Sequence, residues 1–346
     1  MKKIIIASAS RGAGKTFVTV GLMKALGKRA GYMKPLGNRL LYSRKSLKDY
    51  DAALIAEAFG LKTPPEELTI GFEHAKIRHT YDRWTMKEKV LEMCEREGRG
   101  KSVLLIESGS DMRHGISVNL DAASLAKYVD GKIVLVVSGD SYDAIDDALF
   151  FADYIMKSGA EFAGVIINNV KEPQDFKDMH LSDLKKAKIK VLGVIPYAEE
   201  LTYYTAGYLA ENIFSRKLTG ERGLDRLVKN VFVGDMSATC AGKEPAFRRE
   251  GKLVITSGDR SDMILAAIDS NASCVVLTNN IMPHPTIVSK ASHACIPLLL
   301  VPTDTYSTAT KIEHMEQLLT KGDTGKIELL GRMVKKHVRL TELTGK

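Results

Sequence analysis

A glycine-containing loop near the start of the chain constrains its fold more than any other feature. The residues Lys3 to Ala9 form an apolar, β-branched run of strand length, and a segment with helical apolar spacing begins at Thr16. The loop between them reads Ser8-Ala9-Ser10-Arg11-Gly12-Ala13-Gly14-Lys15-Thr16. Glycines let backbone N–H groups close around phosphate oxygens, a lysine can reach the β- and γ-phosphates, and a threonine hydroxyl can bind Mg²⁺. A strand, a Gly-Lys-Thr loop and a helix in this order predict a P-loop.

This loop is a variant, because Ala9 stands where the general P-loop pattern has its first glycine. A glycine turn with a chance Lys-Thr pair is the alternative interpretation, but the complete strand, loop and helix context favours phosphate binding. The residues predicted to bind the nucleotide phosphates are Ser10, Arg11, Gly12, Ala13, Gly14, Lys15 and Thr16.

Short apolar runs alternate with helical patterns along most of the chain, which is typical of βαβ units and a parallel sheet. The predicted fold class is α/β, with a doubly wound, mainly parallel P-loop sheet followed by a smaller α/β domain. The candidate strands of the first sheet are Lys3 to Ala9, Gly31 to Lys34, Ser102 to Glu107, Lys132 to Ser138, Ala163 to Asn168 and Lys190 to Ile195.

The alternation breaks after Ile195-Pro196-Tyr197, and the stretch from Ser215 to Gly223 is rich in charge and glycine. We therefore expect a first domain over residues 1–214, a second over 215–325, and a charged tail over 326–346 whose role stays open. The second domain should contain strands at Val231 to Gly234, Lys252 to Ser257, Ser273 to Thr278 and Ile296 to Val301, with helices at Ser261 to Ile268 and Thr305 to Leu319.

Composition excludes some classes of protein. No apolar run approaches the roughly 18 residues of a membrane span. The opening run Met1 to Ile6 stops within a few residues, so we interpret it as the first strand of a cytoplasmic protein and not as a signal peptide. The formal charge of +8 is dispersed, which favours a basic surface that attracts anionic ligands over a nucleic-acid interface.

The segment Gly31-Tyr32-Met33-Lys34-Pro35-Leu36 resembles the Lys-Pro strand end of dethiobiotin synthetases. Their phosphate loop likewise lacks the usual first glycine. That family uses a lysine at this strand end to position the substrate and the transferring phosphoryl group, and Lys34 is the matching residue. The resemblance thus implies that Lys15 and Lys34 are catalytic, while a solvated lysine at a strand tip is the alternative for Lys34.

The same resemblance implies a magnesium site. In the family, Mg²⁺ is held by the loop threonine, an aspartate that opens the next helix and a glutamate that ends a later strand, and these places match Thr16, Asp51 and Glu107. Mg²⁺ prefers hard oxygen ligands, and Glu107 is expected at the carboxyl edge where open sheets bind ligands. Otherwise Asp51 would be a helix cap and Glu107 a surface acid.

The segment Gly164 to Val170 resembles the strand end at which the family reads adenine through an asparagine amide. Asn168 is the matching residue, and Asn169 could share or replace that role. A GTPase would show Asn-Lys-x-Asp here, whereas this chain reads Asn-Asn-Val-Lys. The expected nucleotide is therefore ATP with Mg²⁺.

The whole chain resembles the amino-terminal region of long phosphotransacetylases even more closely, including Gly193-Val194-Ile195-Pro196-Tyr197. Their second domain is of the DRTGG type, and three segments here look like its signatures: Val233 to Ser237, Ile255 to Asp262 and Val301 to Thr305. Asn279-Asn280 replaces two glycines of many such domains, although asparagine tolerates left-handed backbone. DRTGG domains are associated with self-association and regulation, which implies a homodimer and makes Asp259, Arg260 and Asp304 structural or regulatory candidates.

Two functions follow from these resemblances. In the first, the chain is a regulatory or sensor ATPase of central metabolism that signals through a DRTGG dimer to an enzyme partner. In the second, it is an ATP-dependent carbon–nitrogen ligase in which Lys15, Lys34 and Mg²⁺ neutralise the γ-phosphate while a carboxylate or carbamate attacks it. The serine-rich substrate segment of dethiobiotin synthetases has no convincing copy after Lys34, and Arg113 and His114 could approach a γ-phosphate or lie in a solvated loop.

Overall fold

The computed structural model describes residues 1–43, 46–316 and 318–345, which form two compact units. The first unit comprises Met1–Ala198 together with Leu319–Lys346, and the second comprises Glu199–Leu318. The chain thus leaves the first unit sixteen residues before the expected boundary at 214/215, and it returns to that unit after the second one. Lys346, the end of the expected tail, lies outside the described residues.

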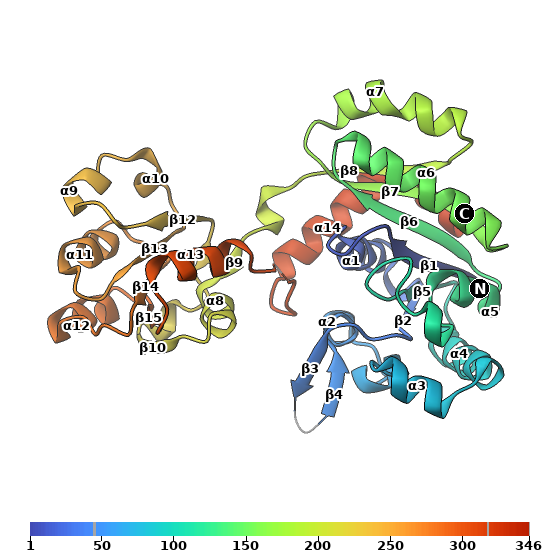
Figure 1. The fold of residues 1–346 in the computed structure, drawn as a ribbon, viewed down its shortest axis with the longest axis horizontal. Coiled ribbons are helices and arrows are strands. Elements are labelled where there is room, and N and C mark those ends of the chain that lie inside the picture. Colours follow the sequence, from blue (N-terminus) through green and yellow to red (C-terminus); the bar gives the residue numbers. More distant parts are fainter. Residues whose placement is uncertain (44–45, 317, 346) are drawn as a thin grey trace. The chain divides into compact units, whose positions relative to one another are not determined.

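A six-stranded parallel sheet forms the centre of the first unit (Figure 1), and all six predicted strands are confirmed to within two residues at either end. Their order is β2-β5-β1-β6-β7-β8, so the chain turns to one side of β1 for β2 and β5 and to the other side for β6 to β8. The loop after β1 therefore lies at a topological switch point, where open α/β sheets bind ligands. The strand bounds are β1 Lys2–Ser8, β2 Ala30–Met33, β5 Val103–Glu107, β6 Lys132–Ser138, β7 Glu161–Val170 and β8 Val191–Pro196.

Helices cover both faces of this sheet, as its wholly buried strand interiors require. A hairpin of β3 (Leu40–Ser43) and β4 (Ser46–Asp49) precedes the second helix. The α-helices are α1 Lys15–Leu26, α2 Tyr50–Phe59, α3 His74–Thr80, α4 Arg83–Gly98, α5 Ala122–Val129, α6 Tyr142–Lys157, α7 Pro173–Lys186, α14 Thr324–His337 and α15 Leu340–Thr344. The 3₁₀ helices are η1 Gly27–Arg29, η2 Pro65–Leu68 and η3 Ile116–Val118.

The C-terminal segment is an integral part of the first unit. Helix α14 packs directly on α1, the helix that follows the glycine loop, and buries Ile327, Leu330 and Val334. Beyond it, the backbone N–H of Arg339 donates to the carbonyl of Leu192 in β8 at 2.8 Å. The expected charged tail is therefore an amphipathic helix whose apolar face completes the layer beside α1.

The crossing of α1 and α14 depends on a glycine. A Cβ at Gly21 would lie 2.4 Å from Val334 Cγ2 and 2.9 Å from the carbonyl oxygen of Leu330. We therefore expect Gly21→Ala to lower the free energy of unfolding by about 1–3 kcal/mol. Gly325→Ala is the control, because its Cβ would meet no atom within 4 Å and alanine favours a helix. Equal stability of the two variants in urea denaturation would contradict this packing.

The second unit contains a five-stranded sheet in the order β10-β15-β14-β13-β12. Four of these strands were predicted and are confirmed, but the antiparallel edge strand β10 was not predicted and falls in the charged, glycine-rich stretch where the domain boundary was expected. The bounds are β10 Arg216–Thr219, β12 Asn230–Val233, β13 Lys252–Ser257, β14 Cys274–Thr278 and β15 Leu298–Leu300, with β9 Tyr204–Thr205 paired to β11 Leu227–Val228. Its helices are α8 Ala206–Asn212, α9 Ala238–Ala241, α10 Pro245–Arg248, α11 Ser261–Asp269, α12 Pro285–His293 and α13 Thr305–Glu313, with η4 Glu199–Leu201 and η5 Glu221–Gly223.

The signature residues of the second unit have local structural partners. Asn279 and Asn280 both adopt left-handed backbone, with φ of 59° and 54°, as expected for the replaced glycines. Arg260 donates to the carbonyl of Met236 at 2.6 Å. Asp304 caps α13 by accepting from the backbone N–H of Ser307 at 2.9 Å. These contacts give Arg260 and Asp304 roles in holding loops, while Asp259 lies in the turn before α11.

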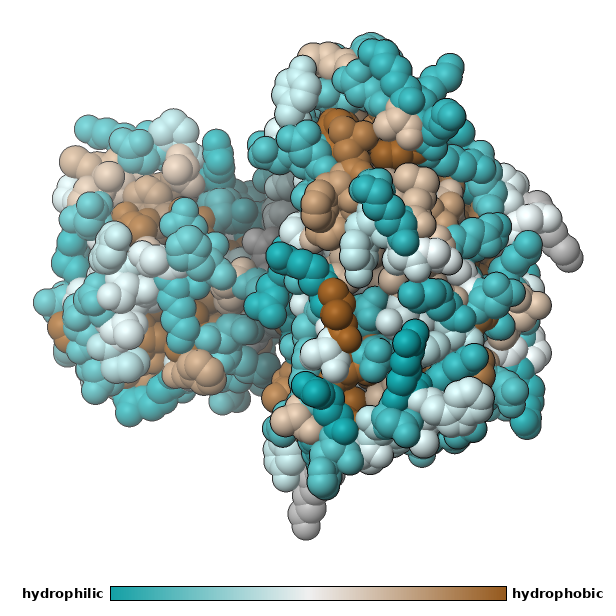
Figure 2. Space-filling model, turned by 45° about the vertical axis from the view of Figure 1, so that its right-hand side comes forward, coloured by the Kyte–Doolittle hydropathy of each residue, from teal (hydrophilic) through white to brown (hydrophobic). Residues whose placement is uncertain are grey.

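Figure 2 shows a face that is hydrophilic over most of its area. Hydrophobic atoms gather on the first unit at the height where Figure 1 places α6 and α7. Phe150 and Met156 of α6 and Met179 of α7 are exposed hydrophobic side chains. Among the described residues, no helix is both long enough and apolar enough to cross a membrane.

Candidate functional site

The glycine loop joins β1 to α1 at the carboxyl edge of the first sheet. Gly12 and Gly14 adopt left-handed backbone, with φ of 83° and 82°. Gly14 is the N-cap of α1 and provides no side-chain cap, so the N-terminus of this helix keeps free N–H donors for an anion. Ala9 has no positive φ and its methyl group is buried in the core, which explains why the first glycine of the general pattern is dispensable here.

Lys15 folds back over the loop that follows β5. Its ammonium donates to the carbonyl oxygens of Gly109 and Ser110, the latter at 3.4 Å, and the residue is 7% exposed. Burial lowers the pKa of Lys15 to about 8, although the nearby carboxylate of Glu107 opposes this shift. The two carbonyls were not predicted from the sequence, because backbone acceptors carry no residue signature.

Glu107 ends β5 and is completely buried. Its Oε1 accepts from the Thr16 hydroxyl at 2.9 Å, and its Oε2 accepts from the Tyr32 hydroxyl at 3.1 Å. Burial raises the pKa of Glu107 despite the attraction of Lys34. The alternative of a surface acid is therefore wrong, and Tyr32 is a partner that the sequence analysis missed.

Lys34 follows β2 and is completely buried, so the alternative of a solvated lysine is wrong. Its Nζ lies 2.6 Å from Asn38 Oδ1, 2.5 Å from Asp51 Oδ2 and 2.9 Å from Asp49 Oδ1. A lysine ammonium has three N–H donors, and here three side-chain oxygens surround it. Burial opposes the charge, but Asp51, Asp49 and Glu107 outweigh it and raise the pKa of Lys34.

Asp51 lies in the first turn of α2 but does not cap the helix. Asp49 is the N-cap and accepts from the backbone N–H groups of Asp51 at 3.0 Å and Ala52 at 3.1 Å. Asp51 instead pairs with Lys34 and with Arg39, whose Nη1 lies 3.2 Å from Asp51 Oδ1. Burial alone would raise the pKa of Asp51, but Lys34 and Arg39 lower it. An aspartate just before a helical pattern is a common N-cap signal, and it would have identified Asp49.

The residues expected to hold Mg²⁺ offer a suitable set of oxygen atoms. Thr16 and Glu107 are in direct contact, while Asp51 is linked through Lys34 and acts electrostatically on Glu107. Glu107 is a buried carboxylate with a raised pKa, and within the described chain no lysine, arginine or histidine lies within 4 Å of it. A hydroxyl and two carboxylates fit the preference of Mg²⁺ for hard ligands, with phosphate oxygens and water completing an octahedron.

Asn168 lies at the end of β7, directly beneath the glycine loop. Its Nδ2 donates to the carbonyl of Ala13 at 3.1 Å, and a Cβ at Gly14 would fall 2.1 Å from that nitrogen. The amide therefore braces the loop and requires glycine at position 14. Asn169, the other residue considered for adenine, has a φ of 60° and donates from its exposed amide to Ser138 Oγ at 3.1 Å.

The loop after β5 brings His114, but not Arg113, towards Lys15. His114 Nδ1 accepts from the backbone N–H of Ser110 at 3.3 Å. Burial, His74, Lys15 and Arg11 together lower the pKa of His114. The Arg113 side chain is 77% exposed and its Nε lies 3.7 Å from Asp111 Oδ1.

Comparison with known families agrees with this geometry. Residues 2–205 match the AAA_26 family, which is described as an AAA domain. The chain belongs to this family. Residues 208–315 match the DRTGG domain, so an AAA_26 P-loop domain is fused here to a DRTGG domain. These findings confirm the predicted fold class. They also confirm the resemblance of the first domain to dethiobiotin synthetases and that of the whole chain to the amino-terminal region of long phosphotransacetylases.

Relatives of this AAA_26 chain include two phosphate acetyltransferases. Those of Nitrosomonas europaea and Pseudomonas aeruginosa are 25% and 24% identical to it, and each match covers 98% of this chain and 51% of the relative. The chain thus spans about half the length of these curated relatives. A cobyrinate a,c-diamide synthase of Listeria innocua is 27% identical over 57% of this chain and 40% of its own length.

Solved structures show only distant similarity. The MinC:MinD cell division complex of Aquifex aeolicus has a TM-score of 0.38 at 18% identity, covering 58% of this chain and 84% of that one. The CBS and DRTGG regulatory region of Clostridium perfringens pyrophosphatase, complexed with diadenosine tetraphosphate, has a TM-score of 0.29 at 18% identity and covers 48% and 68%. At these scores neither structure adds to the family assignment.

Proposed function

We propose that this chain is a regulatory or sensor protein of central metabolism whose first unit binds Mg-ATP. The N-terminus of α1 offers backbone donors, and Lys15 stands beside them with a buried ammonium whose hydrogen-bond partners among the described residues are carbonyls. Phosphate oxygens are stronger acceptors for a lysine than carbonyls. The family assignment and this cradle support nucleotide binding.

Magnesium would be held by Thr16 and Glu107, with Asp51 as the third protein group. When bound, Mg²⁺ neutralises charge on the phosphates. Burial raises the pKa of Glu107, and a divalent cation beside its carboxylate would favour the charged form. Asn168 donates a hydrogen bond to the glycine loop, so this contact links the phosphate site to the strand end that is expected to bind adenine.

The arrangement of Lys34 is the observation that carries the regulatory proposal. Rapid phosphoryl transfer needs cationic donors aimed at the oxygens where charge develops. All three N–H donors of Lys34 face Asn38, Asp49 and Asp51. We therefore assign Lys34 to positioning Asp51 and leave Lys15 as the lysine that contacts phosphate, a combination that suits binding better than fast turnover.

An ATP-dependent ligase is the second candidate. The diamide synthase relative, whose match covers 57% of this chain, supports it. In this case Lys34 would exchange one carboxylate partner for a phosphoryl oxygen and become catalytic, and a carboxylate or carbamate substrate would attack the γ-phosphate.

Nucleotide-dependent association separates the two candidates. We expect Mg-ATP and a non-hydrolysable analogue to change the dimer fraction or the affinity for an enzyme partner equally, because an effector works by differential binding and not by being consumed. ADP release should stay far below the ~1 s⁻¹ that marks the slow end of ordinary enzymes. Sedimentation velocity measures association, and a coupled assay measures ADP.

The exposed Lys28→Ala variant is the control for both assays and should behave like the wild type. An ADP release rate that rises strongly with one member of a carboxylate, carbamate or amine panel would establish the ligase instead. Identical sedimentation and partner binding with and without nucleotide would refute the regulatory proposal.

A further inference from the structure

A strongly basic cavity of about 580 Å³ lies in the second unit, at the amino ends of its parallel strands. Lys252 is the first residue of β13, and Lys229 immediately precedes β12. Arg226, Arg248 and Arg249 also line the cavity, as does a single carboxylate, Glu250. This edge of the sheet is opposite the edge that carries the DRTGG signature loops after β12, β13 and β15.

Charge is concentrated here and is not compensated. Five cations and one carboxylate leave a formal excess of four positive charges, which is half of the +8 carried by the chain. Elsewhere in the second unit, Arg260 pairs with Asp262 and Lys290 with Asp269. Within the described residues, none of the five cations of the cavity lies within 4 Å of a carboxylate. The missing counter-charge must come from solvent ions or a ligand.

Lys252 is the residue that distinguishes this cavity from an ordinary basic surface. It is only 2% exposed, and its ammonium donates to the carbonyl of Ser270 at 2.9 Å and lies 5.2 Å from the centre of the Phe247 ring. Burial lowers the pKa of Lys252. Among the described residues, the ammonium has carbonyl partners but no carboxylate within 4 Å, and an anion in the cavity would offset the free-energy cost of burying its charge.

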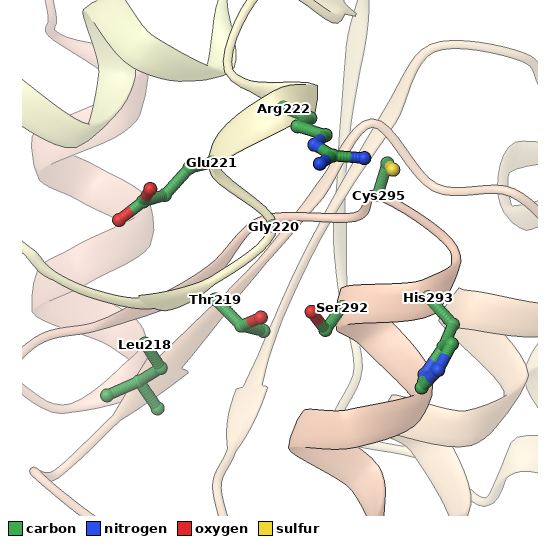
Figure 3. Close-up of a pocket in the computed structure, with 8 residues that line it drawn as sticks. All are labelled: Leu218, Thr219, Gly220, Glu221, Arg222, Ser292, His293 and Cys295. Atoms are coloured by element: carbon green, nitrogen blue, oxygen red, sulfur yellow. The ribbon is translucent and has the colours of Figure 1, made fainter.

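A second cavity in the same unit, of about 550 Å³, has a different character (Figure 3). It has one guanidinium, that of Arg222, which extends towards Cys295, while the Ser292 hydroxyl faces Thr219 and Glu221 points away. The charged side chains that line it are of both signs, and they are exposed. Of these two cavities, the one around Lys252 combines a buried cation with several flanking ones, and the one around Arg222 does not.

We propose that the cavity around Lys252 binds a small molecule that carries two or more phosphoryl groups. Arginine forks bind phosphate oxygens in pairs, and lysine supplies a compact charge. Ligand pockets of roughly 300–1,000 Å³ hold small molecules and cofactors, so the volume fits a ligand of nucleotide size. The cations converge on one cavity and form no extended stripe, which favours a small ligand over nucleic acid. The site is separate from the glycine loop and gives the DRTGG domain a ligand of its own.

Calorimetric titration of the full chain tests this proposal. The titrations use Lys15→Ala protein, so that the glycine loop does not compete, with tripolyphosphate, ADP and inorganic phosphate as probes. We expect tripolyphosphate to bind at one site per chain and more tightly than inorganic phosphate, with affinity falling as salt is added. ADP binding close to that of tripolyphosphate would identify a nucleotide, and tripolyphosphate binding alone would identify a ligand read only through its phosphates.

Two substitutions and a matched control locate the binding. Lys252→Met and Arg249→Gln should each weaken tripolyphosphate binding at least about tenfold, because each removes a charged hydrogen-bond donor. Lys243→Gln removes an exposed charge from the same unit outside the cavity and should change nothing. Arg249 is exposed, so its variant keeps the test valid even where Lys252→Met unfolds the unit.

In the Lys15→Ala background, equal binding with and without Arg249→Gln, or equal losses in Arg249→Gln and Lys243→Gln, would overturn the site. Tighter binding of a single-stranded oligonucleotide than of tripolyphosphate, lost in Arg249→Gln, would overturn the assignment to a small molecule.

Discussion

Replacing Lys34 with methionine should lower the free energy of unfolding of the first unit by about 3–5 kcal/mol, because removing one partner of a buried ion pair strands the other. Here two buried carboxylates lose their shared ammonium partner, those of Asp49 and Asp51, whose side chains are 0% and 5% exposed. Asp51 keeps Arg39 as a cationic partner, and Asp49 keeps the backbone N–H groups that it caps. Methionine has nearly the length of lysine, so little packing is lost. Trp84 is the one tryptophan of the chain and belongs to the first unit, but it is 68% exposed, so circular dichroism is recorded together with its fluorescence to follow this transition in urea.

The stability difference should depend on pH with a defined sign. In the wild type, the pKa of Asp51 is lowered from its usual 3.8. The ionised Asp51 therefore contributes to the free energy of unfolding above pH 3.8, and this contribution is lost as the pH falls through the pKa of the folded protein. In Lys34→Met the main attraction is gone, and burial raises the pKa of Asp51. The variant therefore takes up a proton at higher pH, and the gap to the wild type should narrow as the solution is acidified towards pH 4.

A double variant provides the control for this interpretation. Lys34→Met combined with Asp51→Asn removes one of the two carboxylate charges that have lost the Lys34 ammonium and should regain part of the lost stability. If Lys34→Met is as stable as the wild type at neutral pH, the ion pairs of Lys34 do not stabilise the fold. A gap that stays constant on acidification would place the loss in packing and not in charge.

The sequence predicts most strands of both sheets well because they are continuous apolar runs that are buried on both faces. It fails at β10, whose Arg216 and Lys217 are exposed on a sheet edge, because an edge strand needs no apolar run. It also leaves the role of α14 open. That helix packs on α1 across some 300 residues of sequence, and no local pattern shows which surface covers an amphipathic face.

The sequence likewise predicts some residues of the candidate site but not their partners. Lys15, Thr16 and Glu107 could be chosen from the sequence because a strand, a loop and a helix fix their places relative to the sheet edge. The partners of Lys34 could not, because they depend on how the β3–β4 hairpin returns Asp49 to the end of β2. The carbonyls of Gly109 and Ser110 depend on the path of a loop.

Lys15→Met should weaken nucleotide binding without lowering stability, whereas Lys34→Met should lower stability. Mg-ATP binding should weaken about 100-fold or more, because a desolvated lysine–phosphate contact is worth several kcal/mol. Stability without nucleotide should not fall, since burial penalises the Lys15 charge and lowers its pKa to about 8. Calorimetric titration with Mg-ATP and Trp84-monitored unfolding measure the two quantities, with Lys28→Ala as the control for both.

Comparison of the two variants tests whether Lys34 stabilises the fold while Lys15 binds phosphate. Lys34 has a raised pKa because carboxylates surround it, so its charge serves the fold. Lys15 has a lowered pKa because it is buried, so its charge destabilises the nucleotide-free protein and would be stabilised by a bound phosphate. Functional sites commonly hold such unfavourable groups in readiness for a ligand. Unchanged Mg-ATP affinity in Lys15→Met, or a large loss of stability, would show that Lys15 is a structural residue and that phosphate binds elsewhere.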